Sequence, residues 1–296
     1  MVGVTIHASN GVETMTVLLL NPGQMGERVG FAAVSSGVDV TWASAGRGAA
    51  TRERAMRAGL RDAGTLASAL ASAEVVLSVV PPHAALVTAQ QVAAQGFAGV
   101  YVDMNAVSPQ TGSSVAAALE ASGGSYVDGG IIGPPPSKRG DTRLYLAGPA
   151  ARQVAGLFEN SVMDARVLDE LAGSTAASAL KMAYAGWTKA SSALLMNVRA
   201  LARANNVEQA LLDEWDISQP GTQARSAKAA TANAFKAWRF IGEMQEIAAT
   251  MEASGLPDGF HLGAADLYRR LEGFKDDMQA EPEAVYAAIV GPTAGS

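Results

Sequence analysis

Short apolar runs separated by helix-like segments dominate the first half of the chain. Residues 17–20, 38–42, 74–80 and 100–104 have the length and the apolar composition of buried strands in a parallel sheet. The segments between them, such as 50–58, have helical composition and spacing. This alternation predicts an α/β fold whose N-terminal part is a Rossmann-type, doubly wound parallel sheet.

The pattern is less regular after residue 104. A helix is expected from Pro109, with Ser108 as its N-cap, and a strand follows at 125–128. The Gly/Pro-rich stretch 129–136 predicts that the strand ends there, in a loop whose glycines let a substrate approach the backbone. Residues 144–147 are predicted to form an edge strand.

From Ala172 the strand signals end, and alanine-rich helical sequence continues to the C-terminus. Helices are expected at 172–204, 207–215, 222–254 and 262–271. The first is long enough to join two domains, whereas the tail after Glu281 is expected to be peripheral. We therefore predict a cofactor-binding Rossmann domain at 15–170 and an all-α domain for substrate binding and dimerisation at 171–296.

The turn after the first apolar run has the pattern of a phosphate-binding turn. It consists of Asn21, Pro22, Gly23, Gln24, Met25 and Gly26. The two glycines let a pyrophosphate approach the backbone and let the next helix pack closely, while the helix N-terminus offers free N–H groups. Asn21 replaces the first glycine of the usual pattern, and asparagine tolerates positive φ. The same sheet edge is expected to bring further residues to the cofactor, namely Val80, Pro81 and Pro82.

The end of the second predicted strand bears on which nicotinamide cofactor binds. A carboxylate at this position usually holds the ribose 2′-hydroxyl of NAD, and this chain has none there. It has instead Ser44 and Arg47, a hydroxyl and a guanidinium that suit a 2′-phosphate. NADP(H) is therefore the expected cofactor. The alternative is that Arg47, Arg52 and Arg54 form only the solvated face of the next helix.

A polar face on the long helix 172–204 is the candidate for proton transfer. Lys181, Tyr184 and Thr188 are three and seven positions apart and share one face. Desolvation and a cationic nicotinamide would lower the pKa of this lysine towards the range of a general acid/base. From the residues alone, the favoured interpretation is a surface lysine that extends its charge into water.

Composition limits the remaining classes of function. The 296 residues carry a net charge of −6 and no Lys/Arg-rich block, which argues against a nucleic-acid partner. Cysteine is absent and the three histidines are far apart, so neither a disulfide framework nor a metal site is expected. No apolar run has spanning length, so we expect a cytoplasmic protein without a membrane partner.

Four stretches, taken together, resemble the β-hydroxyacid dehydrogenase superfamily, which includes 3-hydroxyisobutyrate and 6-phosphogluconate dehydrogenases and the related imine reductases. The stretches are the glycine turn at 21–26, Asp103 to Pro109, Asp128 to Gly133, and Gly173 to Tyr184. The resemblance implies a catalytic role for Lys181. It also implies a substrate-binding segment, which here comprises Asp128, Gly129, Gly130 and Ile131, and a substrate contact at Asn105, where the family has serine.

Two departures concern the substrate. Tyr184 stands where the family usually has asparagine, and Ile132, Gly133 and Pro134 replace its Ser-Gly-Gly. We expect an NADP(H)-dependent oxidoreductase for a small hydroxy acid or carbonyl compound, with Lys181 moving the proton while Tyr184 and Asn105 orient the oxygen. Thr188 is a further substrate contact, and the helical domain forms a homodimer. The alternatives are an imine reductase and a non-catalytic module that senses NADPH.

Overall fold

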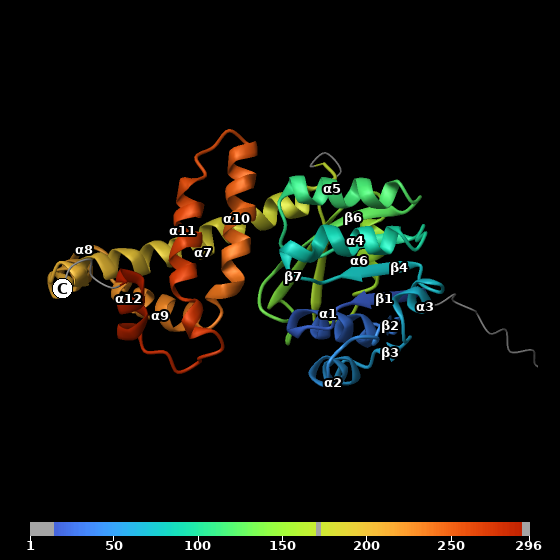
Figure 1. Ribbon diagram of the computed structural model, residues 1–296, viewed down its shortest axis with the longest axis horizontal. Helices are drawn as coiled ribbons and strands as arrows, with labels where there is room; N and C mark the ends of the chain where they lie inside the picture. The colour runs from blue at the N-terminus through green and yellow to red at the C-terminus, as the bar shows by residue number, and fades with distance from the viewer. Residues whose placement is uncertain (1–14, 170–172, 292–296) are drawn as a thin grey trace, which may run out of the picture.

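The computed structural model describes residues 15–169 and 173–291 and contains one eight-stranded sheet (Figure 1). The strands are β1 (Thr16–Leu20), β2 (Asp39–Trp42), β3 (Arg61–Asp62), β4 (Val75–Ser78), β5 (Val100–Asp103), β6 (Ser125–Ile132), β7 (Thr142–Ala147) and β8 (Met163–Val167). Their order is β3-β2-β1-β4-β5-β6-β7-β8, and every neighbouring pair is parallel except β6 and β7. The predicted Rossmann-type sheet is confirmed.

Helices cover both faces of the sheet, as a doubly wound fold requires. They are α1 (Gln24–Ser35), α2 (Ala49–Arg57), α3 (Leu66–Leu70), α4 (Ala85–Ala93), α5 (Pro109–Glu120) and α6 (Ala151–Gly156). One hydrophobic cluster joins α1, α2 and α6 to one face, and another joins α3, α4 and α5 to the opposite face. Alternate residues of β1 belong to different clusters, with Leu19 on one side and Leu18 on the other. Burial on both faces explains why these strands are continuously apolar.

The second half of the described chain is helical, as predicted. It comprises α7 (Ala176–Ala204), α8 (Glu208–Ser218), α9 (Thr222–Ala234), α10 (Ala237–Ala253), α11 (Gly259–Arg270) and α12 (Pro282–Val290). The 29-residue helix α7 begins against β6 and runs out into the helical region, where α9, α10, α11 and α12 pack on it (Figure 1). At 1.5 Å per residue it spans roughly 44 Å, which is enough to connect the two parts.

Two strand predictions were wrong. β6 does not end at residue 128 but continues through the glycine pair to Ile132, because Gly129–Ile132 pair with β7 in antiparallel register. β7 is not an edge strand, because β8 pairs with its other side. Pairing with β7 therefore extends β6 through residues 129–132, whose low strand propensity predicts a loop.

The C-terminal tail was also wrongly predicted to be peripheral. Residues Val285, Tyr286 and Ile289 of α12 are buried in the helical core. The Tyr286 hydroxyl donates a hydrogen bond to the Ser226 carbonyl of α9 at 3.0 Å. This helix therefore belongs to the packed core of the C-terminal region.

Candidate active site

Two adjoining cavities form a groove along the carboxyl edge of the parallel strands, where ligands bind in open α/β sheets. A cavity of about 400 Å³ lies beside the ends of β1 and β2, and another of about 450 Å³ lies between β6, α7 and α10. They share Val80, Pro81 and His83 in their walls. One extended ligand with two bulky ends suits such a groove.

The glycine turn has the geometry that a dinucleotide requires. Asn21 has a φ of 60°, as its substitution for glycine predicts, and its side-chain amide donates to the Val79 carbonyl at 3.3 Å. A Cβ on Gly26 would lie 2.5 Å from the Asn21 carbonyl oxygen, so only glycine fits there. Gly23 caps α1 without a side-chain hydrogen bond, and a Cβ at Gly23 would meet nothing closer than 3.9 Å. Gly23 to Gly26 line the larger cavity, so the N-terminus of α1 borders space that can hold a phosphate.

Beside the smaller cavity, the two polar residues predicted to recognise a 2′-phosphate are placed differently. Arg47 is exposed and lines the cavity, whereas Ser44 is 6% exposed and its hydroxyl, after the Gly64 backbone N–H, helps to lower the pKa of the Asp62 carboxyl. The guanidinium groups of Arg52 and Arg54 bond backbone oxygens of neighbouring loops. Arg52 and Arg54 therefore shape the groove, and Arg47 offers its charge to it.

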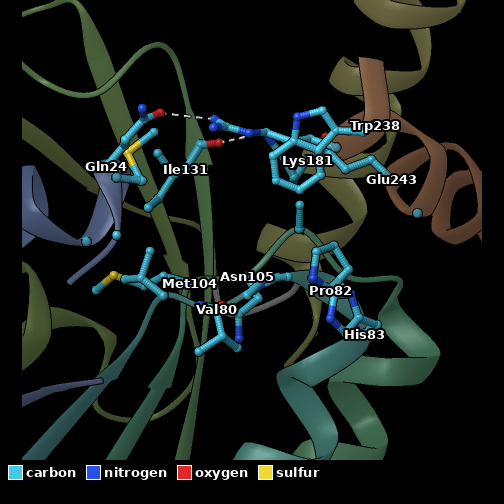
Figure 2. Close-up of a pocket in the computed structure, with 18 of the residues that line it drawn as sticks. Gln24, Val80, Pro82, His83, Met104, Asn105, Ile131, Lys181, Trp238 and Glu243 are labelled. Atoms are coloured by element: carbon cyan, nitrogen blue, oxygen red, sulfur yellow. Dashed lines mark hydrogen bonds between the residues drawn. The ribbon is translucent and has the colours of Figure 1, made fainter. Parts of the chain in front are cut away.

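Lys181 reaches the larger cavity from the second turn of α7 (Figure 2). Its Nζ donates a hydrogen bond to the Ile131 carbonyl oxygen at 2.9 Å, which fixes the amine at the end of β6. Burial lowers the pKa of this amine from 10.5 to about 8, because the charged form loses solvation. An amine with such a pKa can both donate and accept a proton near neutral pH.

The start of α7 is tied to the sheet by a buried carboxylate. Asp128 accepts hydrogen bonds from the Ser178 backbone N–H at 2.7 Å and from the Ser178 hydroxyl at 2.6 Å. Tyr126 donates a further bond to the same carboxylate at 3.2 Å. Lys181 follows one turn later, so Asp128 holds the helix that carries the lysine.

Gly129 and Gly130, predicted to bind a substrate through their backbone, do not line either cavity. A Cβ on Gly130 would lie 2.6 Å from the Ala177 carbonyl oxygen, and one on Gly129 would lie 2.9 Å from the Asp103 oxygen. Both glycines therefore allow close packing inside the structure. Of the predicted substrate segment, Ile131 alone lines the larger cavity.

Asn105 lines the larger cavity, as predicted, and also connects two strand ends. Its Oδ1 accepts a hydrogen bond from the Val80 backbone N–H at 2.6 Å, and its Nδ2 donates to the Ser78 hydroxyl at 3.2 Å. The side chain is 3% exposed. Asn105 thus fixes the loop between the two cavities.

Tyr184 and Thr188 lie on the same helix as Lys181 but line neither cavity. The Tyr184 side chain is 46% exposed, and the Thr188 hydroxyl bonds the Tyr184 carbonyl oxygen at 3.1 Å. Shared helical face is therefore not sufficient to bring these groups to the lysine. A third residue of this helix, Lys189, forms a half-buried ion pair with Glu243 of α10.

The sequence interpretation missed one wall of the site. It is formed by α10, which contributes Trp238, Arg239, Gly242 and Glu243. Among the apolar side chains of this helix, Phe240 and Met244 are buried, whereas Trp238 is 37% exposed. The adjacent aromatic and cationic side chains at 238 and 239 were a signal, but the sequence does not fix which of them faces a ligand.

Helix α10 is also fastened to the sheet domain. Glu246 accepts hydrogen bonds from the Ser108 backbone N–H at 2.6 Å and from the Thr111 hydroxyl at 3.0 Å, at the N-terminus of α5. Ser108 caps α5, and Pro109 begins it, as predicted. A carboxylate at this position also complements the helix dipole.

Over residues 15–169 and 173–291, no group of three or more His, Asp or Glu side chains could hold a metal ion. Within the same ranges, none of the helices combines the length and the hydropathy needed to cross a membrane.

Comparison with known proteins agrees with this geometry. Residues 19–158 match the NAD-binding domain of 6-phosphogluconate dehydrogenase, and residues 202–271 match a domain of unknown function (DUF1932). Among curated proteins, none is significantly similar in sequence.

Solved structures share the fold over nearly the whole chain. A conserved hypothetical protein from Sinorhizobium meliloti 1021 is 22% identical with a TM-score of 0.69, over 94% of this chain and 97% of that one. Mycobacterium tuberculosis 3-hydroxyisobutyrate dehydrogenase, solved with L-serine, is 16% identical with a TM-score of 0.65, over 92% and 98%. A reductive aminase from Aspergillus terreus, in complex with NADPH and ethyl levulinate, is 19% identical with a TM-score of 0.54, over 92% and 98%.

The match over residues 19–158 assigns a nicotinamide-dinucleotide-binding domain to the part of the chain that forms the glycine turn and the sheet. Beyond that domain, the solved structures share the overall fold of the chain, including 3-hydroxyisobutyrate dehydrogenase and the reductive aminase, the kinds of protein that the sequence motifs resemble.

Proposed function

We propose that the protein is an NADP(H)-dependent oxidoreductase that interconverts a small hydroxy acid and its carbonyl form. The observation that carries the proposal is Lys181, whose amine lies in the same cavity as Gly23 and Gly26 of the glycine turn. A nicotinamide dinucleotide bound in the groove would supply or accept the hydride. The turn and the N-terminus of α1 would hold its pyrophosphate, and Arg47 would face the adenosine end.

Lys181 would handle the proton. In carbonyl reduction its ammonium form donates a proton to the developing alkoxide, and in oxidation its neutral form removes the hydroxyl proton. The bond from Nζ to the Ile131 carbonyl orients the amine, and Asn105 fixes the adjoining loop. Tyr184 and Thr188, which line neither cavity, have no part in this proposal.

Replacement of the lysine tests the assignment. We expect Lys181→Ala to lower kcat by about 10²-fold or more, since general acid–base catalysis contributes 10²–10⁴-fold, while the Kd for NADPH stays within about twofold. Lys228→Ala, an exposed lysine on α9, is the matched control. The measurement is NADPH consumption with a panel of carbonyl acids, ketones and cyclic imines. Unchanged turnover in Lys181→Ala would refute the proton role, and turnover of imines alone would favour imine reduction.

The preference for NADP(H) rests on Arg47 and on the missing carboxylate at the end of β2. Parallel fluorescence titrations with NADPH and NADH test it, with an expected difference in Kd of about tenfold or more in favour of NADPH. Tighter binding of NADH would refute the role of Arg47. Failure of both nucleotides to bind would refute the dehydrogenase assignment itself.

We also propose that the helical region forms a homodimer. Trp187, Leu194 and Leu201 follow at seven-residue spacing on α7 and are 72%, 63% and 64% exposed. Phe260 of α11, 79% exposed, lines a cavity of about 510 Å³ beside this face. Such an apolar surface is typical of an interface. Sedimentation equilibrium is expected to give a dimer for the wild type and a monomer for Leu194→Glu. Met56→Glu on α2 is the control and should remain a dimer. A monomeric wild type would contradict the proposal.

A further inference from the structure

The wall of the active-site cavity opposite the sheet presents an aromatic ring and a cation from α10. Trp238 lies on its first turn and lines the cavity that holds Lys181 (Figure 2). Arg239 follows on the same turn and lines the same cavity. Trp238 is 37% exposed, a high value for the largest apolar side chain of the site. A side chain of this size that stays open to a cavity is available for contact with a ligand.

Arg239 is held in place but is not neutralised. Its guanidinium carbon lies 5.0 Å from the centroid of the Trp238 ring, and its Nη1 donates to the Gln24 side-chain oxygen at 3.1 Å. That oxygen belongs to a neutral amide, and none of the ion pairs among the described residues includes Arg239. The guanidinium therefore retains donors and a full charge for an anion.

The charges around the cavity favour an anionic ligand. The carboxylate in its wall, Glu243, is paired with Lys189 behind it, and this pair is neutral in sum wherever the shared proton lies. Lys181 and Arg239 are the cationic side chains of the wall. Lys275, whose Nζ lies 4.6 Å from the Trp238 ring centroid, adds positive charge outside it. Opposite charge at short range stabilises a bound carboxylate most where water is excluded.

The backbone of β6 does not offer an alternative anion site. Gly129 and Gly130 lie within the strand, away from both cavities, with Ala177 and Asp103 packed against them. The wall of the larger cavity also includes the apolar side chains of Met25, Met104 and Ile131, and the carbonyl oxygen of Ile131 accepts the hydrogen bond from Lys181. An anion with an apolar substituent therefore finds its charged partner on α10 and its apolar partners around the lysine and Trp238.

We propose that Arg239 binds the carboxylate of the substrate and that Trp238 contacts an apolar substituent, so that the substrate class is a small hydroxy or oxo acid with an apolar substituent such as a phenyl group. This inference rests on the proposed function and deepens it. The reacting oxygen would lie at Lys181, and the carboxylate would lie at Arg239, on the opposite wall. Specificity then depends on α10, and proton transfer depends on α7.

Binding measurements test the proposal independently of turnover. Calorimetric titrations of the NADPH-loaded protein, in which a hydroxy acid has no hydride acceptor and cannot react, would use 3-hydroxy-3-phenylpropionate, its methyl ester and 3-hydroxybutyrate. For the wild type we expect the acid to bind about tenfold or more tightly than the ester, because a charge-assisted bidentate hydrogen bond is lost in the ester. Arg239→Gln is expected to abolish this ratio, and Arg239→Lys to retain part of it. Arg225→Gln, an exposed arginine on α9, is the control.

Trp238→Ala is expected to remove the preference for the phenyl over the methyl substituent and to leave the ratio of acid to ester unchanged. An unchanged ratio in Arg239→Gln would overturn the proposal. So would a parallel loss of affinity for NADPH, which would assign Arg239 to the cofactor instead, or the absence of binding by all three compounds. Turnover assays on the same proteins separate the two hypotheses. If the acid binds but neither the wild type nor any variant turns it over, the oxidoreductase is refuted but the anion site is not. If the acid is turned over and the Arg239 variants bind it like the wild type, the anion site alone is refuted.

Discussion

The contact between Gly130 and the first turn of α7 makes a quantitative prediction. In Gly130→Ala, the new Cβ would lie 2.6 Å from the Ala177 carbonyl oxygen and 3.4 Å from the Lys181 Cβ. Because C···O contacts lie near 3.3 Å or more, the helix start must retreat by roughly 0.5–1 Å. Overpacking of this kind costs about 1–3 kcal/mol of unfolding free energy. A displacement of about 1 Å at a catalytic group can also lower kcat by about 10²-fold.

The assay combines urea unfolding, steady-state kinetics and NADPH titration on the same variant. Gly130 does not line the groove, so the Kd for NADPH should stay within about twofold while stability and kcat fall. Gly156→Ala in α6 is the matched control, because its Cβ would meet no atom within 4 Å. That helical substitution should stabilise the protein by about 0.5–1 kcal/mol. Wild-type stability and kcat in Gly130→Ala would refute the idea that the glycine positions the lysine.

Three further outcomes are expected. Burial raises the pKa of the Asp103 carboxyl from 3.8 to about 7, so its contribution to stability is full below about pH 4 and is lost as the pH rises through about 7. Asp103→Asn should flatten that dependence in pH-resolved urea titrations and add up to about 4 kcal/mol at pH 8; a curve parallel to the wild type would contradict it. Glu246→Gln should lower the free energy of unfolding by about 1–2 kcal/mol, because its hydrogen bonds to α5 lose their charge. Exposed Glu252→Gln is the control, and an equal loss of unfolding free energy in both variants would refute the role of Glu246. Since the pKa of Lys181 is about 8, kcat/KM for carbonyl reduction should fall above that pH and kcat/KM for alcohol oxidation should rise, and pH-independent rates would exclude the lysine as the proton donor.

The parts of the fold that could be predicted are those in which local pattern and tertiary environment agree. The strands of the parallel sheet are buried on both faces, so their composition alone identifies them. The glycine turn could be located because Gly26 is required by the adjacent Asn21 carbonyl, a constraint between neighbours in sequence. The position of Lys181 followed from family-like motifs rather than from helical spacing, which also selected Tyr184 and Thr188 outside the cavities.

The remaining features depend on contacts between distant segments. Gly129 and Gly130 suggested a loop, but their small size serves α7 and the end of β5, about which the local sequence carries no information. Helix α12 is nine residues long, too short for its apolar spacing to distinguish core from tail. Trp238 and Arg239 are adjacent on α10, and the rotation of that helix against the sheet decides that both reach the cavity.

Lys181 and the α10 wall are attached to the sheet in different ways, and the carboxylate of Asp128 makes the difference. Because Asp128 of β6 bonds Ser178 at the start of α7, the position of Lys181 is fixed relative to the sheet that carries the glycine turn. The Trp238–Arg239 wall belongs to the helical region and reaches the sheet domain through side-chain contacts such as those of Gln24 and Glu246. If α10 recognises the substrate as proposed, substitutions along α10 would change substrate preference and leave in place the contacts that hold Lys181.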